Sequence, residues 1–358
     1  MSSEIPLTRP KVTIEDIARE AGVHPASVSR ALRGVGTKVS PQTKLRIEGI
    51  AERLGYRPNA VAASLRTKKT HLVGIVVPDL GNPLFGPIVQ GIETELRQRG
   101  YMSLIAQTPA DMRLRKDVIE ALVDRQVTGL VILAAESDDP MLESAQRAHV
   151  PTVLVNRGFG ERRFSSIVND DRESVRLVLE HLVGLGHTEI GHIAGPATSS
   201  TGRSRREAFD ELAQPLGVRA SVVMAVSFTR TAGLAAAREL LDRSPVTAIF
   251  GANDLIAMGV LDALKERGLS VPSDVSLVGH NDMPFVDLIA PPLTTVRVAV
   301  DQMSRQAAQL LIELVDMPDQ PPSMRVLLPT LIVRESTAPA RPRTDAALAG
   351  VPRFKQAD

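Results

Sequence analysis

The chain has 358 residues, a formal net charge of +1 at neutral pH and no Cys. This length accommodates two or three domains with cores of their own, and the lack of Cys excludes disulfide bonds, thiol catalysis and cysteine metal sites. No apolar run reaches membrane-spanning length and no apolar signal-peptide segment occurs near the N-terminus, so we expect a cytoplasmic protein with no membrane partner.

Charge is distributed unevenly along the chain. Residues 1–70 contain 13 Lys and Arg against 6 Asp and Glu, a net charge of +7, whereas the remaining residues contain 29 against 35, a net charge of −6. A basic N-terminal segment on an acidic body is the charge distribution of a nucleic-acid-binding protein. A basic segment that is only solvated surface is the alternative.

Residues 12–34 predict two short helices joined by a tight turn. Thr13 and Asp16 have capping-box spacing, and the apolar residues that follow recur at helical spacing as far as Gly22, which can adopt positive φ at the bend. Pro25 stands where a second helix would begin, because the first helical residue needs no N–H donor. This is helix-turn-helix spacing, in which the second helix can enter the DNA major groove. On spacing alone, an ordinary pair of antiparallel helices is the alternative.

The second of these helices has an apolar and a polar face. Val28, Ala31 and Leu32 recur at helical spacing and should pack against the first helix. The side chains that remain outside are Ala26, Ser27, Ser29, Arg30 and Arg33.

A third helix should begin at Pro41, with Ser40 as its N-cap, and end at Gly55. Its Leu45, Ile50 and Leu54 are expected to cover the first two helices. Such a three-helix segment has a small core and little stability of its own.

Residues 57–70 can form only a short helix at 60–66, which would not persist alone in water. Leu65 is an apolar side chain followed by basic residues, and minor-groove proteins use such a wedge to unstack a base step and bend DNA. A flexible basic linker is the other interpretation.

From His71 onward, short β-branched runs alternate with amphipathic helical patterns. The four runs before residue 157 are continuously apolar, which is typical of strands in buried parallel sheets. Two such series in tandem predict two doubly wound lobes, whose ligands bind beyond the carboxyl ends of the strands, so we expect a site in the cleft between the lobes. The predicted strands are 73–78, 103–108, 129–134, 151–156, 190–195, 222–227, 247–253 and 275–281, and the main helices between them are 83–99, 112–126, 171–185, 204–216, 231–242 and 254–267.

The last part of the chain predicts an amphipathic helix at 300–315 and closing strands within 325–336. After Ser336 the sequence is rich in Ala, Pro and Arg, so residues 337–358 are expected to be disordered. No leucine heptad occurs there, which argues against a tetramer built on a C-terminal coiled coil.

Together these motifs resemble the LacI/GalR family of bacterial transcription regulators over residues 12–336. The resemblance implies an α/β protein in which an all-α helix-turn-helix head is joined by a hinge helix to a two-lobed, periplasmic-binding-protein-like core of doubly wound parallel sheets. The implied parts are the head at 1–58, the hinge helix and linker at 59–70, the core at 71–336 and the tail at 337–358, with lobe 1 at about 71–168 plus 297–327 and lobe 2 at about 169–296 plus 328–336.

The resemblance also implies which residues contact DNA. Pro25, Ala26 and Arg30 match the base-reading positions of the recognition helix, and a hinge helix at 59–66 would fold when two protomers bind a palindromic operator, with Leu65 opening the central base step. The family usually has Ser or Thr at the position of His24, and we hypothesise that His24 contacts a phosphate in a pH-dependent way. The candidate DNA-binding residues are His24, Pro25, Ala26, Ser27, Ser29, Arg30, Arg33, Asn59, Ala62, Leu65 and Arg66.

The same resemblance assigns an effector site to the cleft. Phe85 and Phe228 match positions that sandwich the effector, and Arg205 matches the arginine that holds it, although RREAF replaces the usual R-x-x-G-F. Sugar-responsive members often have Asp where this chain has Asn156 and Asn281, so the site has lost negative charge while it keeps the positive charge of Arg205. Because Arg binds carboxylate or phosphate through paired hydrogen bonds, an organic acid is as good a candidate for the effector as a sugar. The candidate effector-binding residues are Asn82, Phe85, Asn156, Arg203, Arg205, Phe228, Asn253 and Asn281, of which Arg203 has surface placement as its alternative.

The expected function is that of a homodimeric transcription repressor on the bacterial nucleoid, whose affinity for palindromic operator DNA is controlled by a sugar or organic acid. A periplasmic binding protein would lack the basic head. An enzyme would need a nucleophile–base pair or metal site at the cleft, and we expect no cofactor, metal or catalytic residue. An architectural DNA-binding protein whose core does not respond to effectors is the third alternative.

Overall fold

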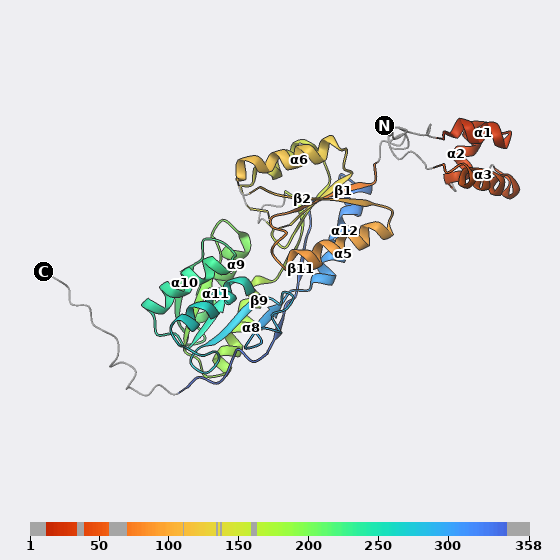
Figure 1. The fold of residues 1–358 in the computed structure, drawn as a ribbon. Coiled ribbons are helices and arrows are strands. Elements are labelled where there is room, and N and C mark those ends of the chain that lie inside the picture. Colours follow the sequence, from red (N-terminus) through yellow and green to blue (C-terminus); the bar gives the residue numbers. More distant parts are fainter. Residues whose placement is uncertain are drawn as a thin grey trace, which may run out of the picture. The chain divides into compact units, whose positions relative to one another are not determined.

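The computed structural model describes residues 12–33, 39–56, 70–109, 111–133, 135–136, 138–158 and 163–341. The chain divides into two compact units, residues 1–70 and 71–358 (Figure 1). Most of the predicted hinge segment, including Asn59, Ala62, Leu65 and Arg66, lies outside the described residues. Within the described ranges, no helix is both long and apolar enough to cross a membrane.

The first unit begins with the predicted capping box. At the start of α1 (Ile14–Ala21), the Asp16 backbone N–H donates to the Thr13 hydroxyl at 3.3 Å, and the Thr13 N–H donates to the Asp16 carboxylate at 2.9 Å. Gly22 ends the helix with a φ of 62°, in the left-handed region that favours glycine. The predicted helix start and bend are both confirmed.

Two further helices, α2 (Pro25–Arg33) and α3 (Pro41–Arg53), complete the small core of this unit. The expected position of Leu45 is wrong, because this side chain is 70% exposed. Leu45 is two residues from the fully buried Ile47, which is about 200° around the helix. The side chains of α3 that are buried in the core are Ile47, Ile50 and Ala51.

Lobe 1 of the second unit is a six-stranded parallel sheet covered by helices on both faces (Figure 1). From edge to edge the strands are β11 (Met324–Leu327), β5 (Ser165–Asn169), β4 (Thr152–Val155), β3 (Gly129–Leu133), β1 (Leu72–Val77) and β2 (Met102–Gln107). One face packs against α5 (Phe85–Gln98) and α12 (Val300–Asp316), and the other against α6 (Arg115–Asp124), which follows the 3-10 turn Met112–Leu114, and α7 (Pro140–Arg147). Strands β3 and β4 are buried along their whole length, which explains their uninterrupted apolar sequences.

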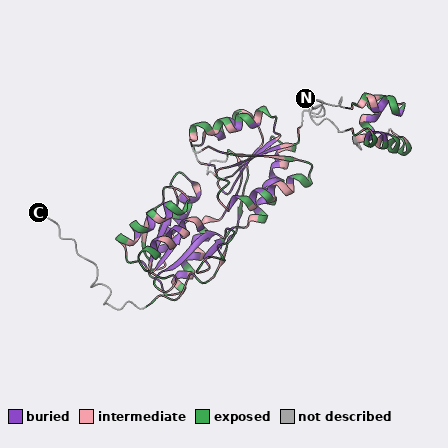
Figure 2. Ribbon diagram, in the orientation of Figure 1, coloured by how far each residue is buried: buried purple, intermediate pink, exposed green. Residues whose placement is uncertain are grey.

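Lobe 2 repeats this architecture. From edge to edge its strands are β12 (Thr330–Ile332), β10 (Thr294–Arg297), β9 (Ser276–Asn281), β8 (Ala248–Gly251), β6 (Glu189–Ala194) and β7 (Arg219–Met224). Helices α8 (Asp171–Gly184) and α9 (Ser200–Ala213) cover one face, and α10 (Arg230–Arg243) and α11 (Asp254–Glu266) cover the other. All pairs are parallel except β10 with β12. In both lobes the buried residues concentrate in the sheets, and exposed residues lie on the outer faces of the helices (Figure 2).

The chain passes between the lobes three times, at 169–171, 297–300 and 327–330. Each crossing runs from the end of a strand in one lobe to the start of an element in the other. Two lobes joined by three short segments can change their relative orientation through small changes at those segments.

The chain end packs on lobe 2 beyond the point where the composition predicts disorder. The Thr337 hydroxyl lies 3.0 Å from His181 Nε2, and the Ala338 backbone N–H donates to the Ser276 hydroxyl at 3.0 Å. The prediction of disorder is therefore wrong for residues 337–341, because composition does not reveal the hydrogen bonds that an extended segment makes with a neighbouring strand and helix. Residues 342–358 lie outside the described ranges.

Candidate effector pocket and DNA-binding face

A pocket with a volume of about 170 Å³ lies between the two lobes, at the carboxyl ends of their strands. The loop after β1 contributes Asp79 and Asn82. Of the three other asparagines, Asn156 directly follows β4, Asn253 comes two residues after β8, and Asn281 ends β9. Seven of the eight predicted effector residues line this pocket: Asn82, Phe85, Asn156, Arg205, Phe228, Asn253 and Asn281.

Arg203 is the predicted residue that the structure does not bring to the pocket. The lining positions of α9 are Thr201 and Arg205, which are four residues apart and share a helix face. Arg203 lies between them in sequence and so projects from a different face, where its Nη1 donates to the Ala197 carbonyl at 2.6 Å. The expected second ligand contact, from Arg203, is therefore wrong, and the alternative of a position outside the pocket holds.

Arg205 is held rigidly in the wall of the pocket. Its Nε donates to the Asp171 carboxylate at 2.8 Å and its Nη1 to the Ala252 carbonyl at 2.5 Å. Burial raises the pKa of Asp171, and the nearby Arg205 opposes that rise. The second terminal nitrogen, Nη2, makes no hydrogen bond with any residue that the structure describes, so it can donate to a ligand.

Arg157 also lines the pocket, although it is not among the predicted residues. Its guanidinium lies over the Phe228 ring, with 5.3 Å between Cζ and the ring centroid, which is cation–π geometry. Burial lowers the pKa of Arg157 to about 10, so the side chain stays charged at neutral pH. Its place directly after a predicted strand, beside Asn156, is the sequence signal that points to it.

Two phenylalanines bring apolar surface to the site, one from each lobe. Phe85 begins α5 in lobe 1 and is buried, whereas Phe228 lies in the loop after β7 and is half-buried. A Cβ added at Gly195 would overlap the Phe228 ring. Glycine at this position, just after β6, therefore lets the ring reach the pocket.

The floor of the pocket at the end of β9 is fixed by a buried carboxylate. Asp254 accepts hydrogen bonds from the Met283 backbone N–H at 2.8 Å and from the Thr295 hydroxyl at 2.6 Å. Burial raises the pKa of Asp254 to about 7. These bonds hold the turn that follows Asn281, whose φ of 116° is unusual for a residue other than glycine.

The first unit carries the predicted DNA-binding face on α2. Ala26 and Arg30 are exposed, while Pro25, Ser27 and Ser29 are half-buried. Arg30 Nε donates to the Ala26 carbonyl at 3.1 Å, which lays the guanidinium along the helix surface. Arg33 ends the helix, and its side chain lies outside the described part of the structure.

His24 occupies the position just before α2, where the resemblance leads us to expect Ser or Thr. Its side chain is exposed, and its Nδ1 accepts the Ala26 backbone N–H at 3.2 Å. The imidazole thus satisfies one of the N–H groups that a helix start leaves without partners. Because Nδ1 must be unprotonated to accept this bond, the phosphate contact that we hypothesise falls to Nε2.

Two family models match the chain. One, described as bacterial regulatory proteins of the lacI family, matches residues 13–59, and the other, a periplasmic binding protein-like domain, matches residues 179–337. The HTH-type transcriptional regulator MalR of Streptomyces coelicolor is 36% identical over 340 residues, covering 91% of this chain and 97% of that protein. The chain belongs to the LacI family of bacterial regulatory proteins. The resemblance noted in the sequence is thereby confirmed.

Solved structures of the LacI family share the fold. The transcriptional regulator CelR–cellobiose complex matches 92% of this chain and 100% of that one, with 32% identity and a TM-score of 0.70. The lac repressor dimer bound to operator and the anti-inducer ONPF matches over the same shares, with 26% identity and a TM-score of 0.82. This LacI-family chain is a DNA-binding transcriptional regulator. In the described residues, no group of three or more His, Cys, Asp or Glu is arranged to hold a metal ion.

Proposed function

We propose that this LacI-family regulator represses transcription as a homodimer on a palindromic operator, in the cytoplasm and on the nucleoid, and that a sugar or organic acid in the pocket controls its DNA affinity. The observation that carries the proposal is that the pocket wall comes from both lobes. A ligand that contacts both lobes stabilises one relative orientation of them over others. A ligand with different affinities for two orientations must shift their populations.

The proposed effector contacts are Asn82, Phe85, Asn156, Arg205, Phe228, Asn253 and Asn281, with Arg157 added. The proposed DNA contacts are His24, Pro25, Ala26, Ser27, Ser29, Arg30, Arg33, Asn59, Ala62, Leu65 and Arg66. Phosphate contacts from Arg and Lys supply salt-dependent affinity, and base contacts supply sequence discrimination.

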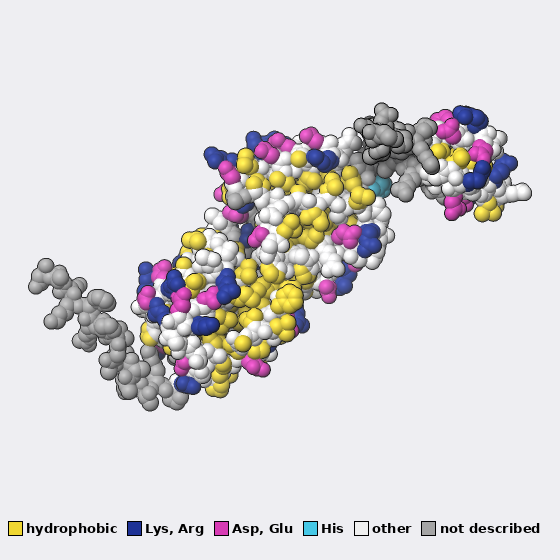
Figure 3. All heavy atoms as spheres, viewed as in Figure 1, with side chains coloured by type: hydrophobic (Ala, Val, Ile, Leu, Met, Phe, Trp, Pro, Cys, Tyr) yellow, Lys and Arg dark blue, Asp and Glu magenta, His cyan; other side chains and the backbone are white. Residues whose placement is uncertain are grey.

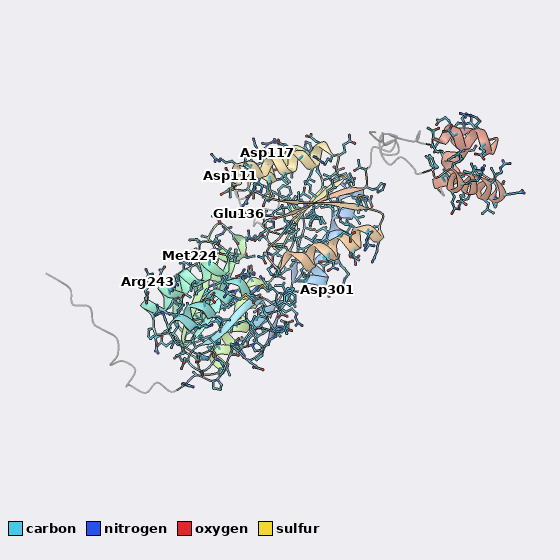
Figure 4. All side chains as sticks on the ribbon, viewed as in Figure 1. Asp111, Asp117, Glu136, Met224, Arg243 and Asp301 are labelled. Carbon is cyan, nitrogen blue, oxygen red and sulfur yellow. The ribbon has the colours of Figure 1, made fainter. Side chains whose placement is uncertain are left out.

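Exposed apolar side chains support the proposed homodimer. Large apolar residues are exposed on the edge strands β2 and β7 and on the loop that follows β9, and apolar side chains gather over both lobes on one face of the core (Figure 3). Apolar edge strands left in water invite association, and a second copy of the chain would cover them. The residues concerned are Met102, Ile105, Met224, Phe285 and Leu288. Met224, on lobe 2, is labelled in Figure 4.

The test begins with selection of an operator from random DNA duplexes by the full-length protein, without any ligand. Recovery of a palindromic consensus supports the proposal, and recovery of unrelated sequences contradicts it.

The DNA-binding face is then tested by Arg30→Ala, with Arg19→Ala on α1 as a control of equal charge. A lost base contact should cost about 1–3 kcal/mol of discrimination, so Arg30→Ala should weaken binding to the selected operator more than binding to random DNA. Arg19 is exposed and lies 3.4 Å from Asp16, and its removal should weaken both alike. Equal losses in the two variants would remove Arg30 from the base-reading face.

A further inference from the structure

The effector pocket is unusually rich in asparagine. The chain has only six Asn residues, and four of them line this pocket. A fifth, Asn169, contacts one of the four. A side-chain amide has an oxygen that only accepts hydrogen bonds and a nitrogen that only donates, so the orientation of each amide decides what it offers a ligand.

Two of these amides are oriented by backbone N–H groups. Asn253 is the N-cap of α11, and its Oδ1 accepts the Ile256 N–H at 2.8 Å. The Asn82 Oδ1 accepts the Leu84 N–H at 3.1 Å. A backbone N–H can only donate, so in both residues the oxygen is used within the protein and the amide nitrogen is left for other contacts.

The other two amides are oriented by neighbouring side chains. The Asn281 Oδ1 lies 3.0 Å from His280 Nδ1, and because an amide oxygen cannot donate, Nδ1 must carry the proton. Burial holds the pKa of His280 well below its ordinary value, so the ring is neutral and presents this one donor. The Asn156 Oδ1 accepts from Asn169 Nδ2 at 3.4 Å.

The side-chain amides and guanidinium groups of the pocket lining therefore offer hydrogen-bond donors. In the part of the chain that the structure describes, none of the four amide nitrogens has a hydrogen-bond partner. Arg205 adds Nη2, and the guanidinium of Arg157 can only donate. Among the lining residues, Asp79 is the carboxylate that can accept, besides its bond from the Gly81 N–H.

A neutral sugar fits this lining poorly. Every sugar hydroxyl donates as well as accepts. Besides Asp79, the side chains of the lining offer its protons the hydroxyls of Thr201 and Thr229 and the second lone pairs of amide oxygens that already accept a hydrogen bond within the protein. Anionic oxygens accept several hydrogen bonds each, and such charge-assisted bonds are about twice as strong as neutral ones. Arginine also binds carboxylate and phosphate oxygens in pairs.

We infer that the effector is a small acid, whose carboxylate or phosphoryl oxygens accept hydrogen bonds from Arg205 and from the amide nitrogens of Asn156, Asn253 and Asn281. His280 is a positioning residue, because its Nδ1–H keeps the Asn281 nitrogen turned toward the ligand. A hydroxyl elsewhere on the same molecule can donate to Asp79. This inference rests on the proposed function, since it assigns the chemical class of the molecule that occupies the effector pocket.

The test uses the full-length protein and matched sets of probes in thermal-shift and calorimetric titrations. One set is D-glucose, D-gluconate and D-glucose 6-phosphate, and the other is D-galactose, D-galactonate and D-galactose 6-phosphate. The acidic members should bind at least about tenfold more tightly than the neutral member of the same set. The difference between the aldonate and the phosphate identifies which anionic group is recognised.

Asn281→Asp is the decisive variant, with Gln146→Glu as the control. The Asp side chain still accepts from His280 but replaces the pocket donor with a negative charge, so acid binding should fall about tenfold or more while neutral-sugar binding does not fall. Gln146 is exposed on α7 and does not line the pocket, so its change from amide to acid should alter neither.

Tighter binding of the neutral members, or binding that Asn281→Asp strengthens, overturns the inference. Absence of binding by every member of both sets overturns it as well. In each case operator selection, which uses no ligand, is unaffected, so a failed inference is distinguishable from a failed regulator function.

Discussion

Arg205→Ala tests the ion pair that forms the wall of the effector pocket. The side chains of Arg205 and Asp171 are only 3% and 11% exposed, and their closest atoms are 2.8 Å apart. Removing one partner of a buried pair leaves the other charge uncompensated and costs roughly 3–5 kcal/mol. Because a domain is stable by only about 5–15 kcal/mol, this substitution should remove a large part of the stability of the core.

The loss should depend on pH. Burial raises the pKa of Asp171 and Arg205 opposes that rise, so removal of Arg205 raises the pKa further. A protonated Asp171 leaves no unpaired charge. The folded variant therefore binds a proton more readily than the unfolded chain, and its stability falls as pH rises. The deficit relative to the wild type should be largest above neutral pH and smallest near pH 4.

Urea unfolding of four proteins measures these effects: the wild type, Arg205→Ala, the double variant with Asp171→Ala, and Arg172→Ala. The double variant should recover part of the lost stability, since the carboxylate that loses its partner is removed as well. Arg172 is a matched control, because its pair with Glu211 is exposed and contributes at most about 1 kcal/mol. Equal losses in the two single Arg variants, or a loss that does not change with pH, would refute the reasoning.

Four further substitutions test three other features of the structure. Burial lowers the pKa of His192 to about 4 from its ordinary 6.5, so on acidification the unfolded chain binds a proton before the folded protein does. Between pH 6.5 and 4 the free energy of unfolding of the wild type should therefore fall relative to that of His192→Gln, by up to roughly 1.4 kcal/mol per pH unit. Urea-unfolding free energies that change in parallel with pH in the two proteins would contradict this. Gly195→Ala should displace the Phe228 ring and weaken effector binding, measured by calorimetry, while the affinity for operator in the absence of effector stays the same. An effector affinity equal to that of the wild type would place the ring outside the site. Leu45→Glu should change the stability of the head by less than about 0.5 kcal/mol, whereas Ile47→Ala should reduce it by about 2–5 kcal/mol. Hydrogen exchange of the backbone amides in the head measures both changes. Similar effects of the two substitutions would mean that Leu45 is not exposed.

The sheets of the core were predictable because several of their central strands, such as β3 and β4, are apolar runs. Strand β5, Ser165–Asn169, escaped prediction because its serines are buried as polar residues and break the apolar pattern. Helix α7, Pro140–Arg147, is only eight residues long, which is too short to show a clear helical periodicity of apolar residues. Strand β7 begins at Arg219, three residues before the predicted start, because exposed edge residues carry a weak apolar signal.

The pocket was predictable to the extent that it follows strand ends. The rule that ligands bind beyond the carboxyl ends of parallel strands points to Asn156, Asn253 and Asn281 without knowledge of the structure. It does not reveal that Arg203 projects away from the pocket, because strand ends say nothing of the face of a following helix. The orienting bond from His280 depends on a ring direction within a buried strand, which the sequence alone does not determine.

The central claim is that occupancy of the pocket controls operator binding, and the most direct measurement is the coupling between the two ligands. The dissociation constant of the selected operator is measured with and without the tightest-binding acid of the probe sets, and that of the acid with and without operator. Thermodynamic linkage requires that each ligand changes the affinity of the other by the same factor. We predict equal factors of about 5–150, the usual range of such couplings. An operator affinity that the acid leaves unchanged, in a protein shown to bind both, would contradict the account.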